Sequence, residues 1–534
     1  MFSGRTADDT VWTLFERRAR LAGDRPLVTL TDGDGREEVS SWAAVARRAV
    51  ALAARLAALG VRPGERVALF GLNSLEYVVA LAGVARLGAV CVPLNALLTA
   101  PEIAWQLADA GAVALIGEAG AAGRLDEAAA LAGFSGSRLA FRGDADGWLP
   151  LEVPGGPRGG GPAAGAGLPP PPRPDDLFEI LYTSGTSGHP KGVMLSHRSM
   201  ASEADNVASY WAARPDDVFL AVLPLFHVNA QLVTLLPAVV TGARLVVARS
   251  FSAGGWVDLV RRHGVTISSV VGTQVRMIMA TPERPDDADT ALRCVPYGLN
   301  VPPALWAAFE RRFGAPLCNI YGLTEAVAVV TAAPVHGDRR IPSVGRPGRG
   351  RAVGVFDEDG HELPPGAVGE IRIGGERGLS LMVGYHGRPD ETAAAFDGEG
   401  RLRTGDLGRF DEDGYLYFVD RAKDMVKRAG ENVSASEVER VVCEFAGVAE
   451  AAVVGRPDPV RDEAVVVFVV ANPGEPIDVA VLDGHCRARL ARFKVPEEYR
   501  LVEALPKTSI GKVEKKTLRR WLAEERPERE EARR

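Results

Sequence analysis

Short apolar runs alternate with amphipathic stretches between residues 66 and 319. The runs are rich in β-branched residues and have the length of buried strands: residues 67–70, 90–93, 218–222, 245–247 and 267–271. Residues 75–87 and 256–263 have the pattern of helices. A further helix is predicted over residues 304–313, which follow Pro302 and Pro303 and precede Gly314. This alternation predicts an α/β fold with doubly wound, mostly parallel sheets.

A second module is predicted after about Asp420. Residues 436–444 have a helical pattern, and residues 451–454 and 465–470 resemble strands. About one hundred residues is an ordinary size for a domain. We therefore predict a large N-terminal domain over residues 1–419, a hinge at residues 420–424 and a small α+β C-terminal domain over residues 425–534.

Residues 153–174 are rich in Gly, Ala and Pro, and end in four consecutive prolines. Such a composition cannot build a core, so it predicts a flexible surface loop or linker. A polyproline segment that binds a partner is the alternative. The segment 524–534 is almost entirely charged, which predicts a frayed end.

Composition narrows the class of protein. The chain has 534 residues, 46% of them hydrophobic and 25% charged, with a net charge of −7. These values predict more than one globular domain and argue against a general nucleic-acid binder. Five scattered cysteines without a Cys-x-x-Cys pair, and no apolar segment at the N-terminus, predict a cytoplasmic protein. Residues 228–243 are too short and too polar for a transmembrane segment. Peripheral membrane contact and a homo-oligomer stay open.

One loop carries the clearest chemistry. An apolar run at residues 178–182 predicts a buried strand, which leads into two Thr, two Ser and two Gly and then into Pro190-Lys191-Gly192. Glycines let backbone N–H groups approach an anion, hydroxyls add donors, and Lys191 adds a positive charge. The loop differs from a Walker A loop, whose lysine lies in Gly-Lys-Ser/Thr. The alternative is a Ser/Gly linker, which seldom separates two apolar segments. The predicted polyphosphate-binding residues are Thr183, Ser184, Gly185, Thr186, Ser187, Gly188 and Lys191.

Further motifs follow in a fixed order: Phe226-His227-Val228-Asn229, Tyr321-Gly322-Leu323-Thr324-Glu325, Arg403-Thr404-Gly405-Asp406, Asp420-Arg421-Ala422-Lys423 and Pro506-Lys507-Thr508-Ser509-Ile510-Gly511-Lys512. Together with the loop they resemble the adenylate-forming superfamily of acyl-CoA synthetases, luciferases and peptide-synthetase adenylation domains. The resemblance spans about residues 39–518. Several motifs are most similar to bacterial acyl-CoA ligases of the crotonobetaine/carnitine-CoA ligase type. The resemblance implies that the C-terminal domain is a mobile lid, and that ATP, Mg²⁺ and CoA take part.

For the motif at residues 321–325, the resemblance implies that Tyr321 stacks on adenine beside Gly322, that Thr324 contacts the α-phosphate and that Glu325 holds Mg²⁺. The residue types agree, because an aromatic face suits a base and a carboxylate suits Mg²⁺ next to phosphate oxygens. A loop with a surface glutamate is the alternative. Asp406 is implied to accept hydrogen bonds from both ribose hydroxyls, with Arg421 contacting ribose or phosphate.

In the C-terminal part, the resemblance implies that Lys423 is the hinge and that Lys512 is the catalytic lysine of adenylation. Lys512 would offset negative charge as the carboxylate attacks the α-phosphate. The alternative for both is an exposed charged turn. The segment implied to bind CoA is Lys427, Arg428, Ala429, Gly430 and Glu431. Arg401 and Leu402 stand where the family usually has aromatic residues.

The resemblance implies that Phe226 and His227 belong to the acyl-binding segment. An aromatic–histidine pair can line an apolar pocket and control access to it. A buried structural histidine is the alternative for His227. The predicted pocket residues are His227, Val228, Asn229, Gly272, Thr273, Tyr297, Gly298, Leu299, Asn300 and Leu323. None of them is charged, which favours an apolar or bulky acid, either ring-containing or of medium to long chain.

The sequence therefore predicts an ATP-dependent carboxylic acid–CoA ligase that forms an acyl-AMP intermediate and then a thioester. The predicted catalytic residues are Thr183, His227, Glu325 and Lys512. Two alternatives stay open. One is an enzyme that converts only preformed acyl-AMP to the thioester, and the other is an adenylating enzyme that loads a carrier protein. A non-catalytic nucleotide sensor is disfavoured, because Lys191, Glu325, Asp406 and Lys512 are all present.

Overall fold

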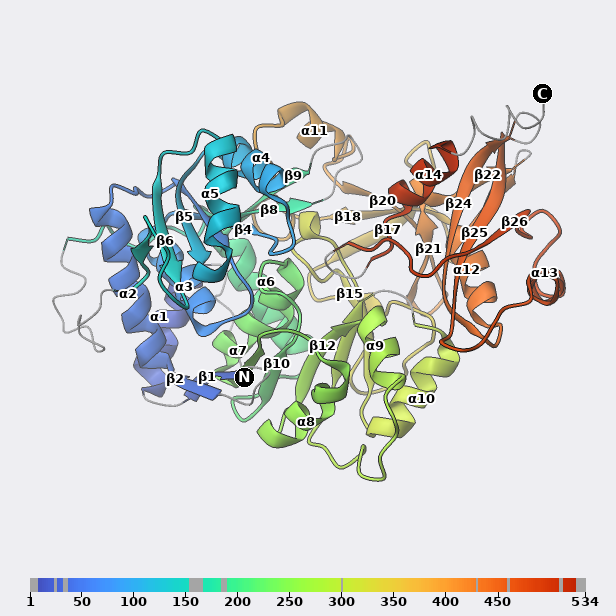
Figure 1. Ribbon diagram of the computed structural model, residues 1–534, viewed down its shortest axis with the longest axis horizontal. Coiled ribbons are helices and arrows are strands. Elements are labelled where there is room, and N and C mark those ends of the chain that lie inside the picture. Colours follow the sequence, from blue (N-terminus) through green and yellow to red (C-terminus); the bar gives the residue numbers. More distant parts are fainter. Residues whose placement is uncertain are drawn as a thin grey trace. The chain divides into compact units, whose positions relative to one another are not determined.

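The computed structural model describes residues 8–23, 26–31, 37–152, 167–183, 190–298, 301–428, 431–458, 462–508 and 512–524 (Figure 1). The chain forms two compact units. Unit 1 comprises Met1–Val353 and Ile373–Leu402, and unit 2 comprises Gly354–Arg372 and Arg403–Arg534. A large and a small unit agree with the predicted organisation. The limits 1–419 and 425–534 and the hinge at 420–424 stay predictions, because a hinge is defined by motion.

One sheet of unit 1 carries the predicted phosphate loop. Its strand order is β19-β9-β8-β4-β3-β5-β6-β7. The strands are β3 (Arg66–Phe70), β4 (Val90–Leu94), β5 (Ala112–Glu118), β6 (Ser137–Phe141), β7 (Leu149–Pro150), β8 (Leu177–Thr183), β9 (Lys191–Ser196) and β19 (Gly384–Tyr385). From β7 through to β8 the strands are parallel, and β9 and β19 are antiparallel to their neighbours. The parallel centre agrees with the predicted α/β class.

A second sheet of unit 1 has the order β16-β15-β14-β13-β12-β10-β11-β1-β2. The strands are β1 (Pro26–Thr31), β2 (Glu37–Ser41), β10 (Val218–Ala221), β11 (Arg244–Ala248), β12 (Ile267–Val271), β13 (Val295–Gly298), β14 (Leu317–Tyr321), β15 (Thr331–Ala332) and β16 (Arg346–Pro347). From β14 through to β1 the strands are parallel. The carboxyl ends of parallel strands share one edge, which is where ligands bind in open α/β sheets.

Helices begin and end in unit 1 where their caps predict. They are α1 (Val11–Ala22), α2 (Trp42–Ala58), α3 (Leu75–Leu87), α4 (Ala100–Ala110), α5 (Ala122–Leu131), α6 (His197–Tyr210), α7 (Leu236–Thr241), α8 (Ala253–His263), α9 (Gly272–Met279), α10 (Pro303–Phe313) and α11 (Pro389–Ala394). The hydroxyl of Ser74 accepts a hydrogen bond from Tyr77 N at 3.0 Å and so caps α3, and Gly88 ends that helix with a left-handed φ of 74°. Nearly all of α3 is buried, although its sequence pattern suggested an amphipathic helix.

The apolar stretch at residues 228–243 forms a buried helical segment. Residues Ala230–Leu235 are in π-helical conformation, and α7 follows directly. The hydroxyl of Thr234 donates to the carbonyl of Ala230 at 2.6 Å. π-Helical turns are rare and occur often at functional sites. This one begins three residues after His227. Among the described residues, every helix falls short of the length or hydropathy that a membrane span requires.

Unit 2 has the α+β organisation predicted for the C-terminal part. A four-stranded sheet has the order β17-β18-β20-β21, and a second sheet has the order β23-β22-β25-β24, with β26 beside β25. The elements are β17 (Ala352–Phe356), β18 (Gly369–Gly374), β20 (Leu402–Phe410), β21 (Leu416–Arg421), β22 (Val426–Arg428), β23 (Glu431–Val433), β24 (Val448–Asp458), β25 (Asp462–Ala471), β26 (Glu498–Leu501), α12 (Ala435–Cys443), α13 (Val479–Arg487) and α14 (Lys515–Glu524).

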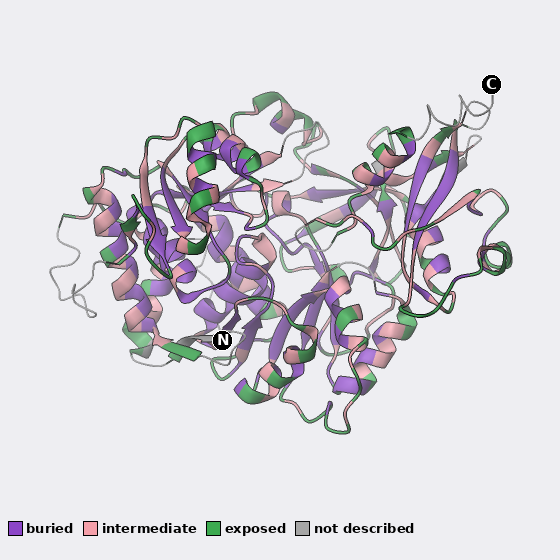
Figure 2. Ribbon diagram, viewed as in Figure 1, coloured by how far each residue is buried: buried purple, intermediate pink, exposed green. Residues whose placement is uncertain are grey.

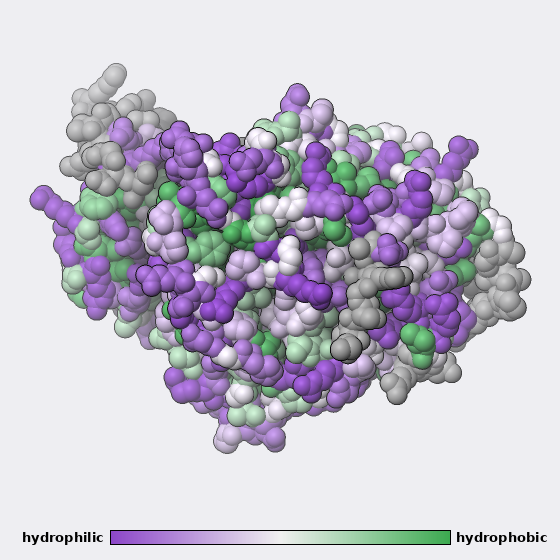
Figure 3. All heavy atoms as spheres, turned by 180° about the vertical axis from the view of Figure 1, so that it is seen from behind, coloured by the Kyte–Doolittle hydropathy of each residue, from purple (hydrophilic) through white to green (hydrophobic). Residues whose placement is uncertain are grey.

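Predicted and observed elements agree closely where the apolar pattern is strong. The predicted strands at residues 67–70, 90–93 and 267–271 lie within β3, β4 and β12, and the helix at 304–313 lies within α10. Of the predicted loop at 153–174, residues 167–174 contain no helix or strand, and residues 153–166 lie outside the described part. Figure 2 shows the central strands as buried, and Figure 3 shows hydrophobic and hydrophilic side chains interspersed on the face it draws.

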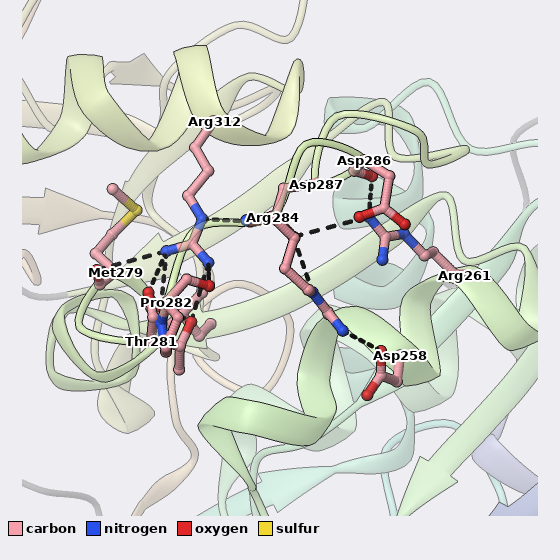
Figure 4. Close-up of polar contacts among 10 residues, drawn as sticks. Asp258, Arg261, Met279, Thr281, Pro282, Arg284, Asp286, Asp287 and Arg312 are labelled. Carbon is pink, nitrogen blue, oxygen red and sulfur yellow. Dashed lines mark hydrogen bonds and ion pairs between the residues drawn. The ribbon is translucent and has the colours of Figure 1, made fainter.

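A buried arginine ties α10 to the segment after α9 (Figure 4). Arg312 Nε donates to Asp287 Oδ2 at 2.7 Å, and its other nitrogens donate to the carbonyls of Thr281 and Pro282, both at 2.9 Å. Both charged side chains are at most 4% exposed. Burial alone would raise the pKa of Asp287, but hydrogen bonds from Arg284 and Arg312 lower it below its ordinary value. The negative charge of Asp287 is therefore stabilised by these hydrogen bonds and not by solvent.

Replacement of Arg312 tests this buried pair. Arg312→Met keeps a long apolar side chain but removes the buried partner of Asp287, which then keeps the contacts of Arg284 and Arg261. Breaking a buried pair costs up to about 3–5 kcal/mol. We expect a lower midpoint of urea unfolding for Arg312→Met, partly restored in Arg312→Met/Asp287→Asn, where both charges are gone. A wild-type midpoint for the single variant would contradict this.

Candidate active site

The predicted phosphate loop connects two antiparallel strands. Thr183 is the last residue of β8, Lys191 is the first residue of β9, and the two are paired directly in the ladder. This pairing holds both ends of the loop at one place on the sheet. The predicted ligands Ser184, Gly185, Thr186, Ser187 and Gly188 lie outside the described residues. The structure thus places the two flanking residues, and their role in binding polyphosphate stays a prediction.

The side chain of Lys191 lies between Tyr385 and Glu391. Its Nζ is 2.5 Å from Glu391 Oε2 on α11 and 5.0 Å from the centroid of the Tyr385 ring. Arg388 lies 3.6 Å from Glu391 and also pairs with Asp109 at 2.9 Å. A partly exposed ion pair of this kind contributes about 1 kcal/mol or less. A ligand with several negative charges can therefore compete with Glu391 for Lys191.

The carboxylate of Glu325 lies at the end of β8. Glu325 belongs to a short 3₁₀ turn, Thr324–Ala326, that follows β14. Its Oε1 accepts hydrogen bonds from Thr183 Oγ1 at 3.4 Å and from Tyr385 Oη at 3.1 Å. The structure therefore brings two predicted catalytic residues, Thr183 and Glu325, together from distant parts of the chain.

Tyr385 was missed by the sequence analysis. It lies in β19, which pairs with β9 next to the phosphate loop. Burial raises the pKa of Tyr385, and the Glu325 charge raises it further, so the phenol stays a hydrogen-bond donor. The dipeptide Gly384-Tyr385 has no spacing that connects it to Glu325, and only the pairing of β19 with β9 reveals its place.

The loop that carries Glu325 is closed by backbone contacts. Val330 N donates to the carbonyl of Tyr321 at 2.9 Å, which joins the two ends of the loop. A Cβ at Gly322 would lie 1.5 Å from the Ala328 carbonyl oxygen, so only glycine fits there. Val327 and Ala328 have left-handed φ angles of 55° and 73°. Each such residue costs of order 1–3 kcal/mol, and strain of this kind concentrates at functional sites.

Three glycines stand at the carboxyl ends of neighbouring parallel strands. Gly272 follows β12, Gly298 ends β13 and Gly322 follows β14. Val271 is paired with Gly298 in the ladder, so the first two positions are adjacent on one edge. A Cβ at Gly298 would meet no atom of the described residues within 4 Å. These strand ends present backbone, with little side-chain bulk, at the edge where α/β sheets bind ligands.

Predicted acyl-binding residues also gather near this edge. Ser269 Oγ of β12 donates to Asn229 Oδ1 at 3.1 Å, which ties the segment of His227 to the strand. The rings of Phe226 and His227 lie 4.6 Å apart, centroid to centroid, and Tyr297 is buried. Val228, Thr273 and Leu323 are partly exposed, and Leu299 and Asn300 lie outside the described residues. The assignment of these residues to an acyl pocket stays a prediction.

A buried carboxyl lies in β8, four residues before Thr183. Glu179 pairs with Cys91 of β4 in the ladder, and its Oε2 accepts a hydrogen bond from Gln231 Nε2 at 3.1 Å. Gln231 also donates to the carbonyl of Leu225 at 3.0 Å. Burial raises the pKa of Glu179 to about 8, against the opposing effect of Gln231. Glu179 is therefore largely protonated at neutral pH.

In unit 2, the predicted ribose ligands face each other across two strands. Asp406 of β20 and Arg421 of β21 are paired in the ladder, and Arg421 Nε lies 3.2 Å from Asp406 Oδ1. Asp406 is buried and Arg421 is exposed. The backbone N–H of Asp406 donates to Thr404 Oγ1 at 3.1 Å. The two predicted residues are thus neighbours, and their contact with a ribose stays a prediction.

The predicted hinge and CoA segment lie at the start of the second sheet of unit 2. Lys423 belongs to the 3₁₀ turn Ala422–Asp424, and its side chain lies outside the described part. Lys427 is exposed, and its backbone N–H donates to Glu463 Oε2 at 2.8 Å. Arg428 donates to the carbonyls of Phe493 and Val495 at 2.7 and 3.1 Å, contacts of a structural kind. Ala429, Gly430 and the side chain of Glu431 lie outside the described residues.

Lys512 is exposed in unit 2, where a tight turn holds its backbone. Its N–H donates to Thr508 Oγ1 at 3.2 Å, and its carbonyl accepts from Thr508 N at 2.7 Å. Lys507 and Val513 form a β-bridge across the same turn. This framework fixes the backbone of Lys512, while its predicted role in adenylation remains to be tested.

Comparison with known proteins identifies relatives over nearly the whole chain. Residues 15–386 match the family model described as AMP-binding enzyme, and residues 437–512 match the AMP-binding enzyme C-terminal domain. The chain is 33% identical over 513 residues to crotonobetaine/carnitine–CoA ligases from Salmonella choleraesuis and Salmonella typhi, covering 95% of this chain and 98% of each relative.

Solved structures of the same fold agree with these matches. The ATP-bound MatB of Rhodopseudomonas palustris is 29% identical with a TM-score of 0.83, over 96% of this chain and 99% of that one. The anthranilate CoA ligase AuaEII in complex with anthranoyl-AMP is 25% identical with a TM-score of 0.83, over 97% and 98%. The o-succinylbenzoate CoA synthetase of Bacillus subtilis, in complex with its acyl-adenylate intermediate, is 26% identical with a TM-score of 0.81, over 96% and 98%.

The protonation of Glu179 predicts a pH dependence of stability. Its pKa is about 8 in the folded chain against an ordinary value of 4.5, so between these values the unfolded chain has released a proton that the folded chain keeps. Stability should fall as pH rises from 5 to 8, by up to about 1.4 kcal/mol per unit. Urea unfolding at pH 5, 6.5 and 8 should show Glu179→Gln gaining on the wild type as pH rises. A constant difference across this range would refute the protonated state.

Proposed function

The chain belongs to the AMP-binding enzyme family, and on that premise we propose that it is an AMP-forming acid–CoA ligase. The observation that supports this proposal most is the position of Glu325. Its carboxylate accepts a hydrogen bond from Thr183, at the strand end that leads into the phosphate loop. A carboxylate beside a polyphosphate loop is what activation of an acid by ATP requires, because the triphosphate is used together with a divalent cation.

In the first half-reaction of this proposal, the carboxylate oxygen of the acid attacks the α-phosphorus of ATP. The bond between the α-phosphorus and the bridging oxygen breaks, pyrophosphate leaves, and acyl-AMP forms. Thr183, Lys191 and the loop between them would bind the phosphates. Lys512 would lie at the attacking oxygen and offset the negative charge that develops there. Tyr321, Gly322 and Thr324 would contact the adenine and the α-phosphate, and Asp406 and Arg421 the ribose.

The residues present fit Mg²⁺. Glu325 offers a hard oxygen ligand, and the hydroxyls of Thr183 and Tyr385 that donate to its Oε1 orient the carboxylate. When bound, Mg²⁺ would neutralise charge on the phosphate oxygens. The left-handed residues after Glu325 and the close approach at Gly322 shape the backbone that carries Glu325, and the two hydroxyls orient its carboxylate before any ligand arrives. A fixed ligand loses little entropy on binding.

In the second half-reaction, the thiolate of CoA attacks the carbonyl carbon of acyl-AMP and AMP leaves. We propose that unit 2 turns about Lys423 between the two steps, taking Lys512 away and presenting the segment from Lys427 to Glu431. The turn Ala422–Asp424 suits a hinge, because a few residues at the end of a strand can absorb the change in backbone angles. We also propose a cytoplasmic location, in agreement with five free cysteine thiols.

For the acid, we propose an apolar or bulky carboxylate, ring-containing or of medium to long chain. The predicted acyl segments carry no charged side chain, and in the described part of the chain no atom lies within 4 Å of a Cβ placed on Gly298. Relatives named for crotonobetaine and for anthranilate show how widely acids vary within this fold. A panel of aromatic, aliphatic, dicarboxylic and quaternary-ammonium acids, assayed for AMP formation with CoA, tests this. A preference for dicarboxylic or quaternary-ammonium acids would refute it.

Lys512 is predicted to serve the first half-reaction alone. Lys512→Ala should lower the rate of acid-dependent pyrophosphate release by about 10²–10³-fold, the usual effect of removing one charge-stabilising contact. Conversion of supplied acyl-AMP and CoA to the thioester should stay near the wild-type rate. Lys507→Ala is the matched control, since it lies on the same turn. Equal loss of both half-reactions in Lys512→Ala would overturn the assignment.

Lys423 is predicted to act through the backbone. Proline fixes φ and removes an N–H, so Lys423→Pro should block the turn between the two arrangements. Pyrophosphate release in the absence of CoA should survive, and thioester formation should fail. Lys423→Ala, which leaves the backbone free, serves as the control. Wild-type ligase turnover in Lys423→Pro would show that the two steps do not need this hinge.

A further inference from the structure

A buried ion pair contacts the loop that carries Glu325. Arg351 Nη2 donates to Glu203 Oε2 at 2.6 Å, and the two side chains are 1% and 2% exposed. Glu203 comes from α6, and Arg351 precedes β17 by one residue. Asn206 Nδ2 also donates to Glu203 Oε2, at 3.3 Å. Burial raises the pKa of Glu203 to about 7, and Arg351 limits that rise. Two buried charges are costly unless their partners satisfy them, so the pair calls for an explanation.

Two further contacts of the pair go to the backbone that follows Glu325. Glu203 Oε1 accepts from Val329 N at 3.3 Å, and Arg351 Nη2 donates to the carbonyl of Val327 at 3.5 Å. Val327 and Ala328 are the two left-handed residues of the loop. The ion pair therefore contacts the strained backbone two and four residues after Glu325.

Arg351 also contacts residues 380–385, a second segment that binds Glu325. Its Nη1 donates to the carbonyl of Ser380 at 2.5 Å. Two residues later, Met382 N donates to the carbonyl of Glu325 at 2.8 Å, and Tyr385, on the same segment, donates to the Glu325 carboxylate. One guanidinium thus connects the strained loop to the segment that fixes both the backbone and the side chain of Glu325.

We propose that Glu203 and Arg351 are positioning residues, whose buried ion pair holds Glu325 at the site of the Mg²⁺-bound triphosphate. The proposal rests on the proposed function, in which Glu325 is the metal ligand. In this proposal neither residue touches a reactant, and both act through the backbone around Glu325. Groups that orient a metal ligand in this way typically change metal affinity or activity by 10–100-fold when removed. Loss of the pair should therefore weaken the binding of Mg²⁺-ATP and leave the metal-independent part of ATP binding alone.

The test measures the dissociation constant of ATP by calorimetry, once with excess Mg²⁺ and once with EDTA. Arg351→Met should weaken binding about tenfold with Mg²⁺ and less than twofold with EDTA. Arg312→Met is the matched control, because it breaks another buried arginine–carboxylate pair of unit 1 that has no contact with the Glu325 loop. Its two dissociation constants should equal those of the wild type.

A double-mutant cycle separates positioning from general damage. If Arg351 acts through Glu325, Arg351→Met should have no further effect on Mg²⁺-ATP affinity in the Glu325→Gln background. Glu203→Gln/Arg351→Met, which removes both charges, should unfold at a higher urea concentration than Arg351→Met, yet keep its weakened Mg²⁺-ATP affinity. Should Arg351→Met not fold, Arg351→Lys takes its place, since an ammonium keeps the charge but cannot reach all three oxygens.

The outcomes are distinct. A loss in Arg351→Met no larger than in Arg312→Met, or a loss that multiplies with that of Glu325→Gln, overturns the positioning role and leaves the proposed function standing. If ATP affinity is indifferent to Mg²⁺ in the wild type, or Glu325→Gln has no effect, then the proposed role of Glu325 falls, and the positioning role falls with it. A loss confined to Mg²⁺-ATP and absent in the Glu325→Gln background supports the proposal.

Discussion

The candidate site of unit 1 depends on one contact, in which the carboxylate of Glu325 lies at the end of β8. Glu325 contacts Thr183 there, although 141 residues lie between the two in the sequence. That intervening chain includes strands β10 to β14 of the second sheet. The loop that holds Glu325 turns so tightly that Gly322 contacts the Ala328 carbonyl and two residues adopt left-handed angles. Such a turn persists only where surrounding contacts over-determine it, and those contacts come from α6, from Arg351 and from the segment before β19.

Much of this fold was predictable because its signals are local. Strands such as residues 267–271 are continuous apolar runs with β-branched residues, and helices such as α10 have a proline start and a glycine stop. Gly322 and Glu325 stood in a recognisable motif. Tyr385, Glu391 and the pair Glu203–Arg351 did not, because their importance comes from contacts between segments far apart in the sequence. The pairing of β19 with β9 brings Tyr385 to Glu325, and no periodicity in the chain records that pairing.

Unit 2 illustrates a different limit. Two of its strands, β24 and β25, and α12 were predicted from pattern, and Asp406 and Arg421 proved to be neighbours across β20 and β21. Lys512 and the CoA segment were predicted by resemblance alone, and in the proposed mechanism their roles depend on a movement of unit 2. Arg428 shows why a sequence motif alone does not assign a role, since its side chain donates hydrogen bonds to the carbonyls of Phe493 and Val495. A charged residue in a motif can serve the fold as well as the ligand.

The central claim is that this chain activates a carboxylic acid by joining it to AMP. The most direct measurement is exchange of radiolabelled pyrophosphate into ATP in the absence of CoA, with a pool of carboxylic acids and with Mg²⁺. The account predicts label in ATP that depends on the acid, because acyl-AMP formation is reversible while the acyl-adenylate stays bound. Label that never appears with any acid, in an enzyme that converts supplied acyl-AMP and CoA to a thioester, would contradict the account and show that only the second half-reaction is retained.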